Sequence, residues 1–351
     1  MRIAALQFAR VRFASPGAAS ARSAWPERRS LIVRAIDDEG TRGHGEASPL
    51  PGYSPDTFEE AERALRAAAA ALPLETDDCL PAAPQIRRLL RPLAVDAPSA
   101  RFALETALLD LAGRRVGASI AALLSGGAPR RALEINALVP PPRGAEAVAR
   151  AERLAAQGFR TFKIKIGAPG QWEDELFALA SLRAALGPSA RLRVDVNGGW
   201  TPAEARRRLA ELAILDLEFV EQPVGPDDLL HFAGADVPLA ADESLRIPDA
   251  LARLADAGAC RVAVLKPAVL GGFFRCLELA REAATYEMRT VVTSIFDGPL
   301  ARAAAAQLAF ALDPPPLACG LSPADGSAPR PSWPPAEKAG LGLAPPPELF
   351  P

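Results

Sequence analysis

Histidine is almost absent from this chain of 351 residues, in which only His44 and His231 occur. Their scarcity largely excludes histidine-built metal centres and acid/base schemes that need two histidines. Both are interpreted as structural, and a place in a substrate pocket is the alternative for His44. Cysteine is also rare, and no C-x-x-C pair occurs. The cysteines are predicted to be reduced core thiols, not a zinc site or a disulfide framework: Cys79, Cys260, Cys276 and Cys319. Any acid/base chemistry must come mainly from carboxylates and lysines.

The chain also has no large excess of positive or negative side chains. The chain has 40 basic and 42 acidic side chains, with a net charge of −2. This balance argues against a nucleic-acid partner or an anionic membrane surface, because counterion release needs a basic excess. No apolar run reaches about 18 residues, so no transmembrane helix is predicted. The amino-terminal residues lack the hydrophobic centre and cleavage site of a signal peptide, and a cytoplasmic location is expected.

At about 150 residues per domain, the length suggests roughly two domains. The first hundred residues contain strand-like runs at 3–13 and 28–37, followed by helical stretches at 56–72 and 99–116. Ser99 is a plausible cap for the second helical stretch. Strands followed by segregated helices indicate an α+β domain.

From residue 133 onward, short apolar runs alternate with helix-like segments. The predicted strands span 134–138, 161–166, 192–196, 217–220, 239–240, 261–265, 290–294 and 317–319. Eight strands alternating with helices imply a parallel sheet, most simply a closed barrel. An open doubly wound sheet fits the periodicity too, but it usually carries a Gly-rich turn after its first strand, which residues 139–144 do not provide.

The tail is proline-rich, with a single apolar cluster at residues 340–343. We expect it to lie in an extended form on the amino-terminal domain, and a disordered tail is the alternative.

Charged residues follow the predicted strands at regular intervals. Lys163 and Lys165 end the second strand and, two residues apart, face the same side of it. The next four strands are followed by Asp195 and Asn197, by Glu221, by Asp242 and Glu243, and by Lys266. The steps from Lys165 through Asp195, Glu221 and Asp242 to Lys266 are 30, 26, 21 and 24 residues, each close to one βα unit. In a barrel all of them lie on the carboxyl-end face, where barrel active sites are found.

Three carboxylates that converge on one point need a cation between them. Oxygen ligands without histidine or cysteine favour a hard ion, Mg²⁺ or Mn²⁺. A lysine near such an ion and near a second lysine is shifted toward its neutral form and can act as a base. This combination suits the removal of a weakly acidic proton beside a carboxylate, with the metal stabilising the enediolate. Alone, each residue is more typical of a helix cap or a surface lysine, but together they indicate a metal-dependent enzyme acting on a small-molecule carboxylate.

These motifs resemble those of the enolase superfamily, in its muconate-lactonising subgroup, and within that subgroup those of the o-succinylbenzoate synthases of menaquinone biosynthesis. The matching pieces are K-x-K at 163–165, D-x-N at 195–197, E-Q-P at 221–223, D-E-S at 242–244 and K-P at 266–267. Residues 43–54 look like the family's capping-domain loop, and residues 102–111 resemble its capping helix. The resemblance implies a modified TIM-type (β/α)7β barrel at 130–320. An α+β capping domain would be formed by residues 1–125 together with the tail, 321–351.

The resemblance also implies roles for individual residues. Asp195, Glu221 and Asp242 would bind Mg²⁺. Lys165 would take the α-proton and return a proton to the departing hydroxyl, and Lys266 would stabilise the enediolate from the opposite face. The supporting or substrate-binding groups would be Lys163, Asn197, Glu243, Ser294 and Tyr53. The substrate would be 2-succinyl-6-hydroxy-2,4-cyclohexadiene-1-carboxylate, which is dehydrated to 2-succinylbenzoate.

The sequence can also be compared with the motifs that other activities of the subgroup require. A base of the mandelate racemase kind would need a histidine near residues 290–294, and none is there. Dipeptide epimerases carry Asp-x-Asp near the eighth strand, whereas residues 317–321 contain no carboxylate. Residues 294–299 differ from the Ser-x-x-Glu-x-Gly form of many members. N-succinylamino acid racemisation remains an alternative on the same lysines and metal, as does a barrel that binds an acid without turnover. The sequence does not predict the oligomeric state.

Overall fold

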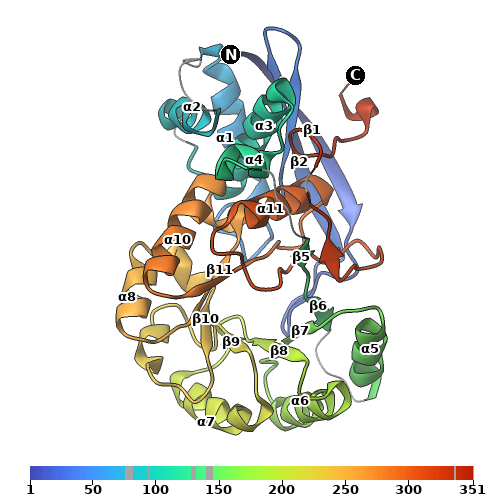
Figure 1. The fold of residues 1–351 in the computed structure, drawn as a ribbon, viewed down its shortest axis with the longest axis vertical. Coiled ribbons are helices and arrows are strands. Elements are labelled where there is room, and N and C mark those ends of the chain that lie inside the picture. Colours follow the sequence, from blue (N-terminus) through green and yellow to red (C-terminus); the bar gives the residue numbers. More distant parts are fainter. Residues whose placement is uncertain (76–81, 94, 128–131, 140–144, 336, 351) are drawn as a thin grey trace.

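The structure is a computed structural model, which describes residues 1–75, 82–93, 95–127, 132–139, 145–335 and 337–350. Figure 1 shows an amino-terminal part with an antiparallel sheet, above a curled parallel sheet with helices on its outside. Three of the predicted core thiols, Cys260, Cys276 and Cys319, are buried and free. Cys79 lies outside the described residues. No helix in the described parts of the chain combines the length and hydrophobicity needed to span a bilayer.

The amino-terminal sheet is antiparallel, in the order β3-β2-β1-β4. Its strands are β1 (Arg2–Ala14), β2 (Glu27–Asp37), β3 (Arg42–Ala47) and β4 (Leu74–Glu75). Strand β3 occupies part of the segment predicted to be a capping loop, which is a loop only after residue 47. This strand was not predicted from the sequence, because it contains glycines, which have low β propensity. They are needed for close packing on helix α3 (Pro98–Val116), since a Cβ atom at Gly45 would lie 2.0 Å from the Ala103 carbonyl oxygen.

The other amino-terminal helices are α1 (Phe58–Ala70), α2 (Ala82–Leu90) and α4 (Ile120–Ser125). Helix α3 is buried along most of its length and packs on strands β2 and β3. The prediction that Ser99 caps α3 was wrong. The N-cap is Ala97, followed by a proline at the first helical position, and the Ser99 hydroxyl donates a hydrogen bond to Asp56 Oδ2 at 2.5 Å.

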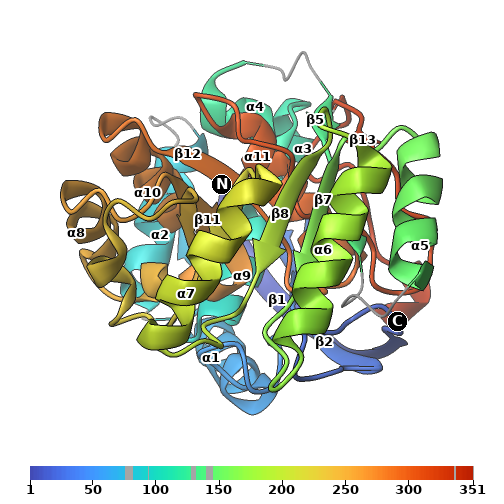
Figure 2. The ribbon, with the colours of Figure 1, turned by 90° about the horizontal axis from the view of Figure 1, so that it is seen from below.

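Seven parallel strands form the barrel, each paired with the next along the chain. They are β6 (Ala137–Val139), β7 (Thr161–Lys165), β8 (Arg191–Asp195), β9 (Phe219–Glu221), β10 (Leu239–Ala241), β11 (Val262–Leu265) and β12 (Arg289–Val292). Figure 2 shows helices on the outside of these strands. The helices are α5 (Ala145–Ala156), α6 (Trp172–Leu186), α7 (Pro202–Leu212), α8 (Ala250–Asp256), α9 (Pro267–Leu270), α10 (Phe273–Thr285) and α11 (Pro299–Ala311). Short 3-10 turns are η1 (Arg91–Leu93), η2 (Ala213–Leu215), η3 (Leu229–Phe232), η4 (Glu243–Arg246) and η5 (Pro347–Leu349).

The predicted eighth strand is reduced to single residue pairs. Cys319 pairs with Ile135, and Gly320 pairs with Thr293, both in parallel orientation. The segment therefore bridges the two edges of the seven-stranded sheet and closes the barrel. The prolines at residues 314–316, which cannot donate to a ladder, prevent the pairing from extending further toward the start of this segment. The predicted first strand is also divided, since β5 (Leu133–Glu134) pairs with β13 (Ser332–Trp333) and β6 alone joins the barrel.

The tail returns to the amino-terminal domain, as expected. The backbone N–H of Leu341 donates to Asp110 Oδ1 of α3 at 2.7 Å. Near the end of the chain, the guanidinium of Arg34 lies 3.9 Å from the centre of the Phe350 ring. The predicted barrel with a capping domain is thus confirmed. The exact domain boundaries stay a prediction, and the one between 125 and 130 falls partly outside the described residues.

Candidate active site

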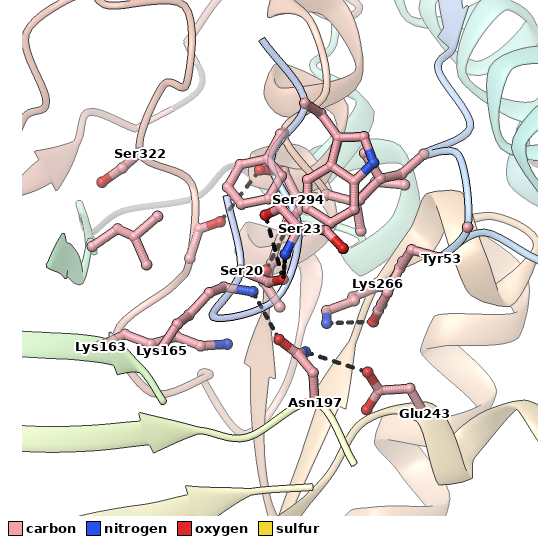
Figure 3. Close-up of a pocket in the computed structure, with 18 of the residues that line it drawn as sticks. Ser20, Ser23, Tyr53, Lys163, Lys165, Asn197, Glu243, Lys266, Ser294 and Ser322 are labelled. Atoms are coloured by element: carbon pink, nitrogen blue, oxygen red, sulfur yellow. Dashed lines mark hydrogen bonds between the residues drawn. The ribbon is translucent and has the colours of Figure 1, made fainter. Parts of the chain in front are cut away.

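A pocket of about 510 Å³ opens at the carboxyl ends of the barrel strands, under loops of the amino-terminal domain. Lys163 and Lys165 of β7 both line it, so the prediction that they face the same side is confirmed. Lys266, which follows β11, lies on the other side of the pocket (Figure 3). The chain contains four lysines among its 40 basic residues, and three of them are here. Arginine stays charged at any physiological pH, so lysine is required where a proton must leave the cation.

Three buried carboxylates lie behind these lysines. They are Asp195 at the end of β8, Glu221 at the end of β9 and Asp242 after β10. Lys163 Nζ lies 2.7 Å from both carboxylate oxygens of Glu221 and 2.9 Å from Asp195 Oδ2. Lys266 Nζ donates a short hydrogen bond to Asp242 and lies 3.7 Å from Glu221 Oε1. Three carboxylates are therefore matched by three ammonium groups when all are ionised.

The lysines differ in their electrostatic environments. Burial lowers the pKa of Lys165, and the charges of Lys163 and Lys266 lower it further against the opposing effect of Asp195. Burial also acts against the charged form of Lys163 and Lys266, but the carboxylates beside them outweigh it and raise the pKa of both. Among the three, Lys165 is the one most easily converted to a neutral amine.

The three carboxylates supply the donors that a hard metal ion prefers. As they stand, no group of three or more acidic, histidine or cysteine side chains in the described parts of the chain is arranged to hold an ion. The reason is that the ammonium groups of Lys163 and Lys266 lie among the carboxylate oxygens. The donor set nevertheless fits a divalent cation, because all donors are carboxylate oxygens and all three side chains are buried.

Asn197 and Glu243 connect Lys165 to the far wall of the pocket. Asn197 Oδ1 accepts a hydrogen bond from Lys165 Nζ at 3.2 Å, and its Nδ2 donates to Glu243 Oε1 at 3.3 Å (Figure 3). Asn197 has a φ of +49°, a left-handed conformation that asparagine tolerates better than most residues. Burial, with the charge of Asp242, raises the pKa of Glu243 to about 8. Both effects favour the protonated form of this carboxyl.

Gln222 explains the middle position of the E-Q-P motif. Its Oε1 accepts hydrogen bonds from the backbone N–H groups of Asp242 and Ser244 at 3.0 and 3.2 Å. Its Nε2 donates to the Val224 carbonyl oxygen at 2.9 Å. The side chain thus fixes the backbone on which Asp242 is carried.

Loops of the amino-terminal domain complete the pocket. Tyr53 donates from its hydroxyl to Asp242 Oδ2 at 2.9 Å and accepts from Lys266 Nζ at 2.7 Å. Arg246 donates to the Tyr53 carbonyl oxygen at 2.8 Å. Arg22 donates to the Asn197 carbonyl oxygen at 2.5 Å, across the mouth of the pocket. Sequence reasoning identified Tyr53 but missed both arginines, which lie in segments without a recognisable motif.

The segment after β12 contributes several residues to the pocket but keeps its acidic side chain away from it. Ser294 and Phe296 line the pocket, and the Ser294 hydroxyl donates to the Gly320 carbonyl oxygen at 3.4 Å. Asp297 is buried and does not line the pocket, because its Oδ2 accepts the N–H of Ile295 at 3.0 Å. The carboxylate of Asp297 thus stabilises the local turn and does not face the pocket. Phe296 was not identified as a pocket residue from the sequence.

The histidines lie away from the pocket. His44 is in strand β3, where its backbone N–H donates to Asp110 at 2.8 Å, and His231 is in the 3-10 turn η3. Neither is among the described residues that line the pocket.

Comparisons with known proteins agree with this architecture. Residues 146–331 match the model of the family described as enolase C-terminal domain-like, and residues 7–125 match the mandelate racemase / muconate lactonizing enzyme N-terminal domain. The chain therefore belongs to the enolase superfamily, in its mandelate racemase and muconate lactonizing enzyme branch, and is an enzyme of that superfamily.

The relatives with similar sequences are named for different reactions. The chain is 40% identical over 196 residues to an o-succinylbenzoate synthase from Thermobifida fusca (strain YX), a match covering 55% of this chain and 60% of that relative, less than two thirds of its length. It is 32% identical over 320 residues to an o-succinylbenzoate synthase from Desulfotalea psychrophila, covering 83% and 85% of the two chains. It is also 29% identical over 286 residues to muconate cycloisomerase 1-1 from Acinetobacter lwoffii, covering 79% and 74%.

Solved structures show the same fold. An L-Ala-D/L-Glu epimerase from Bacillus subtilis superposes with a TM-score of 0.86 and 26% identity, covering 97% of this chain and 98% of that one. An N-succinyl Arg/Lys racemase from Bacillus cereus ATCC 14579 superposes with a TM-score of 0.89 and 22% identity, covering 99% and 97%. The fold is therefore shared with an epimerase and with a racemase.

Proposed function

We propose that this chain is a Mg²⁺-dependent o-succinylbenzoate synthase, a lyase that dehydrates 2-succinyl-6-hydroxy-2,4-cyclohexadiene-1-carboxylate to 2-succinylbenzoate in the cytoplasm for menaquinone biosynthesis. The observation that carries the proposal is the pair of buried lysines on opposite sides of one pocket, whose pKa values are shifted in opposite directions. The identity to the Thermobifida fusca synthase supports the choice of substrate.

The opposite shifts suit two different tasks. Lys165, whose pKa is lowered, accepts the proton α to the ring carboxylate. The electrons of the broken C–H bond enter the ring, the C–O bond breaks with its electrons on oxygen, and Lys165 returns the proton so that water leaves. Lys266, whose pKa is raised, stays protonated and stabilises the anion formed between these steps. Lys163 is a supporting group beside Glu221, and Asn197 orients Lys165.

We assign Asp195, Glu221 and Asp242 as the residues that hold Mg²⁺, with Mn²⁺ as an alternative ion. When bound, the ion supplies positive charge that stabilises the anion produced by proton removal. Gln222 holds the backbone of Asp242 in place for this role.

The charge of the pocket favours an anionic substrate without an ammonium group. The basic side chains that line it are Arg22, Lys163, Lys165, Arg246 and Lys266. Among the described lining residues Glu243 is the single acidic one, and burial raises its pKa and so favours its neutral form. A dipeptide would therefore bring its ammonium group into a site without a carboxylate free to pair with it. A dicarboxylate substrate suits this arrangement.

N-succinylamino acid racemisation is the second candidate. An N-succinylamino acid is also a dicarboxylate without an ammonium group, and Lys165 and Lys266 are placed on opposite sides of the pocket, as a two-base reaction needs. A barrel that only binds acids is disfavoured, because every group needed for turnover is present.

A direct ultraviolet assay tests the proposal. Purified protein, Mg²⁺ and the cyclohexadiene substrate should show rapid loss of the diene absorbance, abolished by EDTA and restored by added Mg²⁺. No turnover by folded, Mg²⁺-loaded protein would overturn the synthase assignment. Incorporation of solvent deuterium into N-succinylamino acids in that case would establish the racemase.

A further inference from the structure

Phe296 has an unusual backbone conformation at the wall of the pocket. Its φ is +60°, in the left-handed region that a bulky side chain rarely adopts. Backbone strain of this kind persists only where the surroundings impose it, and it is concentrated at functional sites. The ring is partly exposed and lines the pocket instead of being buried in the core.

A buried arginine of the amino-terminal domain holds this conformation. Arg28 Nη1 donates to the carbonyl oxygens of Ile295 and Phe296, at 2.6 and 3.1 Å. Arg28 is 1% exposed, so these bonds are shielded from water. On the other side of the turn, Asp297 Oδ2 accepts the N–H of Ile295. The backbone is fixed on both sides, and the Phe296 ring is left free to face the pocket.

The ring belongs to an aromatic surface beside the proposed base. The ring centroids of Trp25 and Phe296 are 6.2 Å apart, with an angle of 35° between the planes. The Trp25 indole N–H donates to the Pro51 carbonyl oxygen at 3.0 Å, which fixes that ring as well. Lys165 Nζ lies 5.6 Å from the centre of the Phe296 ring. The reacting carbon of a substrate must come close to Lys165, so the atoms attached to it lie near this surface.

We propose that Phe296, backed by Trp25, is a specificity-determining residue that selects a carboxylate carried on a conjugated six-membered ring over an open-chain N-acylamino acid. The inference rests on the proposed function, whose substrate carries a conjugated diene in such a ring and whose product carries a flat aromatic ring. A planar π system lies favourably against another aromatic face, whereas a tetrahedral chain with free rotation gains less from it. The aromatic surface beside Lys165 thus favours dehydration over racemisation.

The test compares two substrates across matched variants. Phe296→Ala removes the ring, Phe296→Tyr keeps it, and Phe296→Leu is a second apolar replacement if the alanine variant does not fold. Phe177→Ala is the control, because Phe177 is 74% exposed on helix α6, outside the pocket. Dehydration of the cyclohexadiene substrate is measured beside deuterium exchange into an N-succinylamino acid, with thermal midpoints for all variants.

We expect Phe296→Ala to lower kcat/KM for dehydration about tenfold, mostly through KM, and to change deuterium exchange less than twofold. Phe177→Ala should stay near the parent, and Phe296→Tyr, which keeps the ring, should keep most of the preference for the cyclohexadiene substrate. Equal loss with both substrates, or no loss with either, would overturn the proposal.

A binding measurement distinguishes failure of this proposal from failure of the proposed function. If the parent protein does not dehydrate the diene, calorimetry with 2-succinylbenzoate and with its saturated cyclohexane analogue decides the matter. Tighter binding of the flat ring, lost in Phe296→Ala and kept in Phe296→Tyr, would support the role of Phe296 without the synthase. Equal affinity of the parent for the two ligands would overturn it.

Discussion

Glu46 of strand β3 accepts a hydrogen bond from the backbone N–H of Leu300, at 3.1 Å, in the first turn of barrel helix α11. The same carboxylate accepts from the N–H groups of Gly298 and Ala301, at 3.0 and 3.1 Å, and from the Ser30 hydroxyl at 2.6 Å. A side chain of the capping domain thus satisfies the free N–H groups at the start of a barrel helix and meets the positive end of its dipole.

Glu46→Gln should lower the free energy of unfolding by about 2 kcal/mol, because a charged acceptor with four donors is replaced by an amide that cannot accept from all of them. Urea denaturation measures the change. Glu59→Gln is the control, since Glu59 is exposed on α1 and should shift the value by less than about 0.5 kcal/mol. Equal effects of the two substitutions would show that the contact with α11 contributes little.

Lys165→Ala should abolish dehydration and leave the thermal midpoint close to that of the parent, because it removes the proposed base. Lys165→Arg should be inactive as well, since arginine keeps its proton. Lys338→Ala, at the exposed fourth lysine, should be fully active. The ultraviolet assay measures all three, and substantial activity in either Lys165 variant would remove this residue from the mechanism.

Mg²⁺ should raise the thermal midpoint of the parent protein, because an ion that binds the folded state stabilises it. Asp195→Asn should reduce this rise strongly, as one of the three proposed ligands loses its charge. Asp174→Asn, at an exposed position of α6, should leave it intact. Differential scanning calorimetry with and without EDTA makes the comparison. An unchanged response in Asp195→Asn would place the metal elsewhere.

Tyr53→Phe should lower kcat about tenfold or more without unfolding the protein. The substitution removes the hydroxyl that accepts from Lys266 and donates to Asp242, and hydrogen bonds to charged groups are worth about 1.5–3 kcal/mol. Steady-state kinetics at saturating substrate tests this effect. A variant with parental kcat would show that Lys266 is positioned by its carboxylate contacts alone.

Glu105 should make stability depend on pH. Burial in helix α3 raises its pKa to about 7, and Arg101 only partly opposes the shift. A carboxyl whose folded pKa is raised stabilises the fold fully below its unfolded pKa, near 4.5, and this contribution is lost as pH rises toward about 7. Relative to Glu105→Gln, the parent should therefore lose stability between about pH 5 and pH 7. Urea midpoints of both proteins across this range measure the difference, and parallel curves would contradict it.

The sequence predicted the barrel because its parallel strands are short apolar runs followed by charged residues at intervals of one βα unit. It also predicted which charges converge, since the spacing of Lys165, Asp195 and Glu221 follows the strand order. Strand β3 was missed because its glycines are selected by contact with α3, a long-range requirement that local propensity does not contain. The prediction of a regular eighth strand at 317–319 was also wrong. The pairing of this segment depends on the positions of both edges of the sheet, which are long-range features as well.

The loop residues that line the pocket could be predicted less well than the lysines and carboxylates at the strand ends. Arg22, Arg246 and Phe296 reach the pocket through loop conformations, and the positive φ of Phe296 is imposed by Arg28, which is 268 residues away in the chain. One signal in the sequence was available and unused. Lysine is so scarce here that each one stands out, and three of the four line the pocket.

The tail has a consequence for the order in which the molecule can be assembled. Both ends of the chain lie at the same end of the molecule (Figure 1), and the capping domain is completed by Leu341 on Asp110 and by Phe350 on Arg34. A ribosome releases these residues after the barrel has emerged. The capping domain, whose strands precede the barrel in the chain, is therefore completed after the barrel, and the loops over the pocket gain their full support only once the tail has been synthesised.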